Sequence, residues 1–147
     1  MDRAFEEPSD KPELYLDAQG NPTEVKVMNN DGVNGVYRNS EGLEKGDVWG
    51  KPAKWVCLSA EKAGEKISIA ILDHKNNVGH PAYSHARGYG LFSTNNMGAL
   101  SFNKYAPQFK LTLNPGQSTT FRHLIIVKTV GFITDEELKR QFDKFNQ

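Results

Sequence analysis

The sequence has little cysteine, no net charge and no long apolar run, and each shortage excludes a class of protein. Cys57 is the only cysteine among the 147 residues, so an internal disulfide and any site built from several cysteines are excluded. The 18 Lys and Arg residues balance the 18 Asp and Glu residues, which makes the formal net charge zero. Without excess positive charge there is no broad attraction to polyanions, so we expect no nucleic-acid partner.

Long apolar segments are also missing. No apolar run is longer than that of residues 124–127, which is far short of the roughly 18 to 20 residues that cross a bilayer. The first ten residues contain no apolar stretch of the kind found in a secretory signal. We therefore expect a soluble protein without a membrane span, and the length fits one domain with its own core.

The sequence does contain a series of short segments typical of β-strands. Residues 55–60 and 66–73 carry apolar side chains on both faces, and the short turn at 61–64 between them predicts a hairpin. The Asn- and Gly-rich stretch 29–35 is expected to be a loop. Further extended segments are expected at residues 13–17, 25–28, 36–38, 85–92, 109–113 and 118–130, the last of them the longest strand and central in its sheet.

The two ends of the chain carry different signals. Residues 1–12 are charged and interrupted by prolines, which predicts an irregular arm. Near the other end, Thr134 and Glu137 have the spacing of a capping box, and an apolar stripe follows, so a helix is expected over residues 134–146. Together these patterns predict an all-β fold, an antiparallel β-sandwich with one C-terminal α-helix, as a single domain over residues 1–147.

The best candidate site surrounds the loop between residues 74 and 85. Three of the four histidines, His74, His80 and His85, fall within about a dozen positions there. A histidine oriented by a carboxylate can transfer protons near neutral pH, and an arginine can hold a carboxylate, a phosphate or a developing oxyanion. We expect one shared cavity in which His74, His85 and Arg87 are catalytic, with Asp73 and Tyr89 in its wall.

The alternative for these residues is a purely structural network. In that arrangement Arg87 pairs with Asp73 or Glu41, and His74 satisfies carbonyl groups of the loop. A metal site is a further alternative, because imidazole and carboxylate suit Zn or Fe. The spacing of the three histidines matches no strong ligand motif, so we expect no metal and no cofactor.

Aromatic residues near this stretch favour a sugar-binding surface. Trp49 lies between glycine-rich turns and is the better ligand candidate, whereas Trp55 lies in a strand with two apolar faces and is expected in the core. The expected substrate-binding residues are Trp49, Tyr89, Asp73, Glu41 and Asn95. No nucleophile motif of the G-x-S-x-G type surrounds the serines, and Cys57 is expected to be a small core residue.

Five sequence motifs resemble the C-terminal half of a bacterial family labelled "methane oxygenase PmoA". The resemblance runs from about Arg3 to the end, and its most specific part is HARGYGLF following a strand that ends in Asp-His. One departure is Ser84, where members of the family usually have Trp before the histidine. The motifs are VNGVYRNSEG, DVWGKPAKWV, IAILDHKNN, PAYSHARGYGLF and LNPGQSTTFRHLIIV.

This resemblance implies a bacterial β-sandwich linked to carbohydrate metabolism, and the compartment, cytoplasm or periplasm, stays open. A carbohydrate-derived ligand is therefore expected at the His/Arg site, either processed by an enzyme or only bound by a sandwich without activity. Members usually have another β-rich half before the matched stretch. A third possibility follows from that length difference, namely a structural half-domain that forms a homodimer or packs against a separate N-terminal half.

Overall fold

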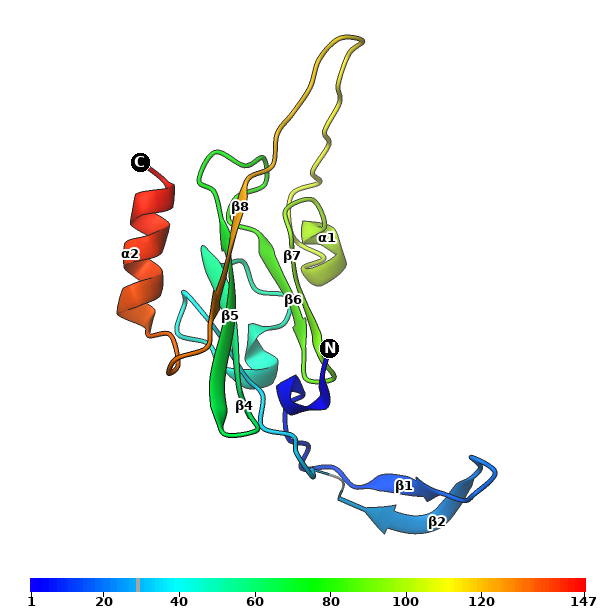
Figure 1. The fold of residues 1–147 in the computed structure, drawn as a ribbon. Coiled ribbons are helices and arrows are strands. Elements are labelled where there is room, and N and C mark those ends of the chain that lie inside the picture. Colours follow the sequence, from blue (N-terminus) through cyan, green and yellow to red (C-terminus); the bar gives the residue numbers. More distant parts are fainter. Residues whose placement is uncertain (29) are drawn as a thin grey trace.

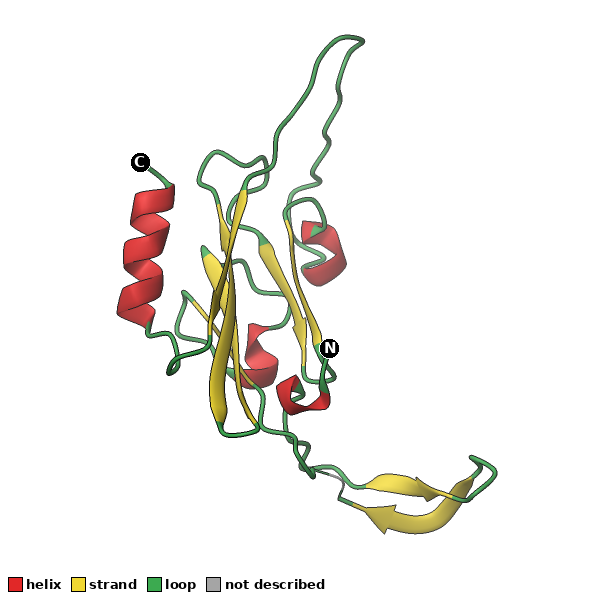
Figure 2. Ribbon diagram, in the orientation of Figure 1, coloured by secondary structure: helices red, strands yellow, loops and turns green. Residues whose placement is uncertain are grey.

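The computed structural model describes residues 1–28 and 30–147, and most of its regular structure is antiparallel β-sheet (Figures 1 and 2). The main sheet has four strands in the order β3-β4-β5-β8. A two-stranded hairpin packs on one of its faces and the C-terminal helix on the other. This arrangement confirms the all-β, sandwich-like fold with one C-terminal helix. Residue 29, which falls in the expected loop, lies outside the described residues.

The elements follow one another in a simple order. The main sheet comprises β3 (Val36–Asn39), β4 (Trp55–Lys62), β5 (Glu65–Asp73) and β8 (His123–Lys128), and the second layer is the hairpin of β6 (Tyr83–Arg87) and β7 (Leu91–Asn95). Another hairpin, β1 (Glu13–Leu16) with β2 (Pro22–Val27), projects away from the body (Figure 1). The helices are η1 (Arg3–Phe5), η2 (Lys45–Val48), the single turn α1 (Ala99–Phe102) and α2 (Asp135–Phe145).

The hairpin of β4 and β5 forms where the sequence predicts it. The strands pair antiparallel from Trp55 opposite Leu72 to Lys62 opposite Glu65. Two residues, Ala63 and Gly64, connect them with φ of 51° and 79°. Positive φ at both positions is the geometry whose twist matches the flanking strands, and glycine adopts it without steric cost.

Alternation along β4 and β5 divides the core into two clusters. One cluster lies between the main sheet and the segment containing α2, and its buried members are Trp55, Cys57, Ala70, Leu72, Ile133 and Leu138. The other lies between the main sheet, the hairpin of β6 and β7, and the N-terminal turn η1; it contains Ala4, Phe5, Tyr37, Val48, Val56, Leu58, Ala60 and Ala86. Residues two apart therefore share a layer, and neighbours in sequence lie in different layers.

The C-terminal helix begins and ends as predicted. The Thr134 side chain accepts a hydrogen bond from the backbone N–H of Glu137, and the Glu137 side chain accepts one from the backbone N–H of Thr134. This reciprocal pair is a capping box and satisfies two helix-end donors. Leu138 is fully buried, and Phe142 and Phe145 pack beside it on the sheet.

Three strand predictions are wrong. Residues 85–92 do not form one strand, because the chain turns at Gly88–Gly90 and pairs with itself as β6 and β7. Residues 109–113 form no strand and belong to a long extended arm between α1 and β8 (Figure 1). The strand expected over residues 118–130 is only the six residues of β8, and it lies at the edge of the sheet rather than in its centre.

The same physical reason explains two of these errors. Alternation of side chains shows that a segment is extended, but it does not supply a neighbouring strand to pair with. Apolar residues on both faces of β8 suggested burial on two sides, yet Ile125 and Val127 are 65% and 61% exposed.

The predicted N-terminal arm also differs in part, because η1 is a helical turn whose Ala4 and Phe5 are buried in the core.

Candidate functional site

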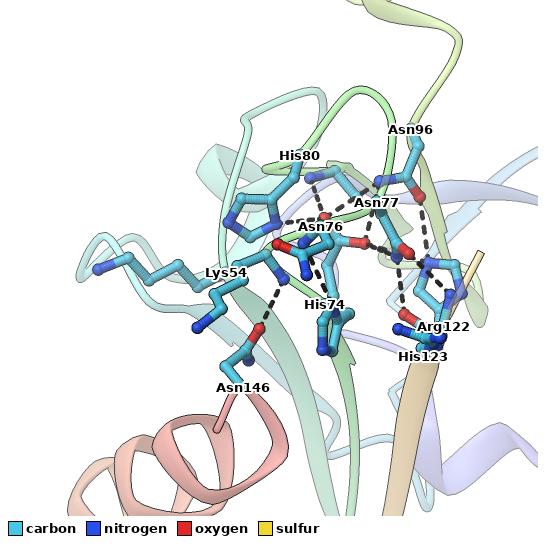
Figure 3. A network of polar contacts seen from close by, with 12 residues as sticks. Lys54, His74, Asn76, Asn77, His80, Asn96, Arg122, His123 and Asn146 are labelled. Carbon is cyan, nitrogen blue, oxygen red and sulfur yellow. Dashed lines mark hydrogen bonds and ion pairs between the residues drawn. The ribbon is translucent and has the colours of Figure 1, made fainter. Parts of the chain in front are cut away.

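Asp73 ends β5 and is the centre of a buried polar network (Figure 3). Its carboxylate is 1% exposed and accepts hydrogen bonds from three nitrogen donors of the protein: Asn77 Nδ2 at 2.6 Å, Ala82 N at 2.9 Å and Asn96 Nδ2 at 2.9 Å. His80 Nδ1 lies 2.7 Å from Asp73 Oδ2. A buried carboxylate needs this many partners, because an unpaired one loses its hydration without compensation.

His123 is the second imidazole at this carboxylate. Antiparallel pairing of β5 with β8 places His123 directly opposite Asp73. Its Nε2 lies 3.3 Å from Asp73 Oδ1 and 3.1 Å from Asn96 Oδ1. We call Asp73, Asn77, His80, Asn96 and His123 the Asp73 network.

The network connects three segments that are distant in sequence. Asn77 donates to the backbone O of Arg122 at 2.7 Å and accepts from its backbone N at 2.7 Å. Asn96 follows β7, His123 opens β8, and His80 lies in the loop between β5 and β6. One carboxylate therefore holds the loop after β5, the end of β7 and the start of β8 together.

The hydrogen-bond partners assign the protons of three imidazole rings. His80 Nδ1 faces a carboxylate oxygen, so this nitrogen carries a hydrogen. His123 Nε2 faces only acceptors, the Asp73 carboxylate and the Asn96 carbonyl oxygen, so it carries one as well. His74 Nδ1 accepts from the backbone N–H of Asn76 at 3.1 Å, which requires a lone pair at that nitrogen.

The predicted cavity shared by His74 and His85 is wrong. His74 directly follows Asp73, so strand alternation directs its side chain to the opposite face. It is 8% exposed, and its ring packs edge-on against Phe145 of α2 with centroids 5.0 Å apart. His85 lies on β6 in the other layer, against Phe102 of α1. The two imidazoles therefore lie on opposite sides of the main sheet.

His85 and Arg87 belong to an aromatic surface on the outer face of β6. Ser84 and Ala86 are 1% and 2% exposed and point into the protein, so the alternating residues point outward. The cluster, which we call the Trp49 platform, consists of Trp49, Tyr83, His85, Arg87 and Phe102.

Phe102 and Trp49 organise this platform. The Phe102 ring stacks on Tyr83 at 5.6 Å and meets His85 edge-on at 5.3 Å and Trp49 edge-on at 5.6 Å between centroids. The Arg87 guanidinium carbon lies 4.5 Å from the centre of the Trp49 ring, a cation–π contact. Arg87 forms this contact, and neither Asp73 nor Glu41 lies in an ion pair with it among the described residues.

A polar groove of about 680 Å³ adjoins the turn that follows Arg87. Gly88 and Tyr89 form one wall, Lys45 and Gly46 another, and the N-terminal arm the third. Tyr89 is 65% exposed. The charged residues along the groove are Arg3, Glu6, Glu7, Asp10, Lys11, Glu13 and Lys45.

Glu7 is the titratable residue of this groove with a perturbed pKa. Partial burial raises the pKa of its carboxyl group, while Lys45 and the backbone of Gly46 act in the opposite direction. Its backbone N–H donates to Gly88 O at 2.7 Å, which ties the N-terminal arm to the turn between β6 and β7. This hydrogen bond therefore joins two adjacent walls of the groove, the arm and the turn.

The last two predicted substrate-binding residues have local structural roles. Asn95 lies opposite Tyr83 in the hairpin, and its Oδ1 accepts from Met97 N at 2.9 Å and Gly98 N at 2.8 Å at the start of α1. It thereby helps to place the turn that carries Phe102. Glu41 is exposed in the loop after β3 and accepts from Ser40 Oγ at 2.8 Å. It is not among the residues that line the groove.

Sequence reasoning missed most of the Asp73 network. It noted His80 but assigned it no role, and it did not single out Asn77, Asn96 or His123. One signal was available: antiparallel pairing of the segment ending at Asp73 with the segment beginning at His123 places the two side by side. Within residues 1–28 and 30–147, no group of three or more His, Cys, Asp or Glu side chains is arranged to hold a metal ion.

The fold and the site define an all-β, sandwich-like protein with a C-terminal helix, a buried carboxylate network and a separate aromatic platform. The chain belongs to a family of unknown function, DUF6807, whose model matches residues 9–143. No curated protein and no solved structure matches the chain. None of the helices in the described part of the chain is long and apolar enough to cross a membrane.

Proposed function

We propose that this protein binds a carbohydrate-derived ligand on the Trp49 platform and in the adjoining groove. The observation that carries the proposal is the Arg87 guanidinium, held 4.5 Å from the centre of the Trp49 ring beside a polar groove of about 680 Å³. A guanidinium presents a planar set of N–H donors that suits carboxylate and hydroxyl oxygens. An acidic sugar, such as a uronic acid, offers both.

The surrounding groups support the same ligand class. The exposed ring of Tyr89 offers an apolar face for a sugar ring, and the charged groups of the groove offer partners for hydroxyl groups. The sequence resemblance to a family linked to carbohydrate metabolism favours the same class. In this proposal Arg87 anchors the ligand, and His85 handles protons if the ligand is processed. His74 lies on the other side of the main sheet and is not part of this site.

The two tryptophans provide a direct test of binding. Trp49 is a half-buried residue of the platform, whereas Trp55 is 6% exposed in the core, so NMR signals of the two indole groups distinguish the platform from the core. Titration with neutral and acidic oligosaccharides should shift the Trp49 signal and leave the Trp55 signal in place. Arg87→Ala should abolish the shift, and Arg140→Ala, which removes an exposed arginine of α2, should preserve it. A Trp49 signal that no acidic or neutral sugar shifts would contradict the proposal.

A second candidate function is that of a half-domain that packs against a protein partner. One specific observation favours it: Ile125 and Val127 of β8 are 65% and 61% exposed on the face of the main sheet opposite α2. Because β8 is an edge strand, it also offers unpaired backbone groups along its outer side. The partner would be a second copy or a separate β-rich half.

Sedimentation tests this second candidate. We expect the chain alone to form dimers or larger species as its concentration rises, and Ile125→Lys combined with Val127→Lys to suppress them. Val130→Lys is the matched control, because Val130 is 84% exposed and lies beyond the end of β8. A compact monomer at high concentration for the unmodified chain would count against a half-domain that needs a partner.

A further inference from the structure

We propose that Asp73 and His80 form a proton-transfer pair, with His80 Nε2 as the basic atom and a hydroxyl-bearing ligand or water as the proton donor. This site is separate from the Trp49 platform and does not depend on the function proposed for that platform. Asp73 is its positioning residue, because it contacts His80 and not the ligand. The proposal rests on the 2.7 Å contact between Asp73 Oδ2 and His80 Nδ1 and on the accessibility of the other ring nitrogen.

The contact with Asp73 decides which nitrogen of His80 is basic. Because Nδ1 donates its hydrogen to the carboxylate, the neutral ring has its lone pair at Nε2. The His80 side chain is 18% exposed. Its Nε2 forms no hydrogen bond with the described residues. The buried side-chain atoms without a partner in this part of the chain are Asn39 Nδ2, Trp49 Nε1 and Ser84 Oγ, and His80 Nε2 is not among them. In Figure 3 the His80 ring nitrogen without a dashed line lies on the far side of the ring from the nitrogen that has one.

The ring of His80 is held in one orientation. One face stacks on Phe142 of α2, with centroids 6.2 Å apart and an interplanar angle of 20°. The backbone N–H of His80 donates to Asn77 O at 3.1 Å, and Asn77 itself donates to Asp73. A base whose orientation is fixed before the ligand arrives requires no reorganisation during proton transfer.

The other three histidines lack this combination. His74 uses Nδ1 to accept from Asn76 N and is 8% exposed. His123 directs Nε2–H toward Asp73 and Asn96, and its distance of 3.3 Å from the carboxylate is longer than that of His80. His85 contacts the Phe102 ring and forms no ion pair with a carboxylate of the described residues.

The proton transfer requires no cofactor, because the ring and the oxygen account for the proton and both electrons. The O–H bond of the bound hydroxyl group or water breaks as Nε2 takes the proton and the oxygen keeps the electron pair. The resulting imidazolium is stabilised by the ionised Asp73 carboxylate, which does not itself take up the proton. The ring returns to its neutral form when Nε2 gives the proton back to the oxygen.

The first test measures the ring protons directly in the unmodified protein. Long-range ¹⁵N–¹H NMR spectra distinguish the two neutral forms of each imidazole from the imidazolium. In the neutral form of each ring we expect His80 to carry its hydrogen on Nδ1, and His74 and His123 to carry theirs on Nε2. A neutral His80 ring with its hydrogen on Nε2 would overturn the proposal.

The second test measures the reactivity of Nε2 with diethyl pyrocarbonate. Nε2 attacks one carbonyl carbon and forms an N–C bond, the C–O bond to the other half breaks, and the released ethyl carbonate yields carbon dioxide and ethanol. Peptide mass spectrometry then gives the rate at each of the four histidines. We expect His80 to react at least about tenfold faster than His74, which is less than the roughly 10²–10⁴-fold that a positioned base contributes to catalysis.

Asp73→Asn connects this reactivity to the carboxylate. The amide can donate a hydrogen to Nδ1 and so favours the wrong neutral form of the ring. In the folded variant, the rate at His80 should fall at least about tenfold while the rate at His85, in the other layer, stays the same. An unchanged rate at His80 would overturn the proposal, and if this variant does not fold, the NMR measurement on the unmodified protein decides.

Discussion

The Asp73 network and the Trp49 platform arise from neighbouring parts of the sequence but differ in burial and in hydrogen bonding. The Asp73 carboxylate is 1% exposed, and its two oxygens accept from protein groups of three segments. On the platform, Arg87 is exposed and its guanidinium lies over the face of the Trp49 ring. The first arrangement uses its polar groups to hold the fold, and the second leaves its donors available to a ligand.

This difference has a direct energetic meaning. Removing one partner from a buried, hydrogen-bonded charge leaves the remaining groups unpaired in a place that water does not reach. Removing an exposed side chain returns its neighbours to water, where they find new partners. Substitutions that alter polar residues in the two regions should therefore separate into large and small losses of stability.

Asp73→Ala should have the largest effect. It leaves Asn77, Asn96 and the Ala82 N–H without their acceptor, so we expect a loss of roughly 3–5 kcal/mol in the free energy of unfolding. Urea denaturation followed by circular dichroism measures it. Asp143→Ala is the matched control, because Asp143 is exposed on α2 and should change stability by roughly 0.5 kcal/mol or less. Similar values for the two variants would show that the network does not hold the fold.

The sequence predicted the local elements well and their partners poorly. The hairpin of β4 and β5 and the capping box at Thr134 depend on residues close in sequence, and both are present as predicted. The edge position of β8 and the hairpin of β6 and β7 depend on which strands meet, which alternation alone does not determine. Pattern reasoning therefore assigned β8 to the centre of the sheet.

The site shows the same limit. Grouping Asp73 with His74 treated neighbours in sequence as neighbours in space, whereas a strand directs them to opposite faces. The histidines that contact Asp73 are His80, in the loop after β5, and His123, which lies opposite Asp73 where β8 pairs with β5. A prediction of the register between β5 and β8 would have found His123. The conformation of the loop that carries His80 depends on tertiary contacts, which side-chain alternation does not predict.

The effect expected at Tyr37 lies between those at Asp73 and Arg87, and it depends on pH. It is 1% exposed, and its hydroxyl group donates to Phe5 O at 3.2 Å. Burial, assisted by the nearby Glu7 and Glu6, raises the pKa of Tyr37 from 10.0 to about 12 against an opposing backbone contact with Gly90. The folded protein therefore retains this proton more strongly than the unfolded chain does.

The sign of the pH effect follows from that difference. The stabilising contribution is complete below pH 10 and is lost as the pH rises from 10 toward about 12, because only the unfolded chain releases the proton in that window. Two pKa units correspond to at most about 2–3 kcal/mol. Denaturation at pH 9 and pH 11 should show a smaller alkaline loss for Tyr37→Phe than for the unmodified protein. Equal losses would mean that Tyr37 does not titrate differently in the two states.

Thr134→Ala removes a polar contact at a helix end and should cause a smaller loss of stability than Asp73→Ala. It removes the side chain that accepts from Glu137 N, so we expect a loss of about 1 kcal/mol in the free energy of unfolding. Thr120→Ala, at an exposed position in the arm before β8, should have almost no effect. If Thr134→Ala lowered the free energy of unfolding as much as Asp73→Ala does, the loss of stability would not depend on how deeply the polar group is buried.

Arg87→Ala should have the smallest effect on stability and the largest on ligand binding. The cation–π contact with Trp49 is partly exposed, so its loss should cost roughly 0.5–1 kcal/mol in urea denaturation. Trp49 and Tyr83 should keep their positions in the variant, because both rings pack against Phe102. Arg140→Ala serves as the control in both measurements. If Arg87→Ala destabilised the protein as much as Asp73→Ala does, Arg87 would belong to the structural framework, and the distinction between a buried framework and an available platform would fail.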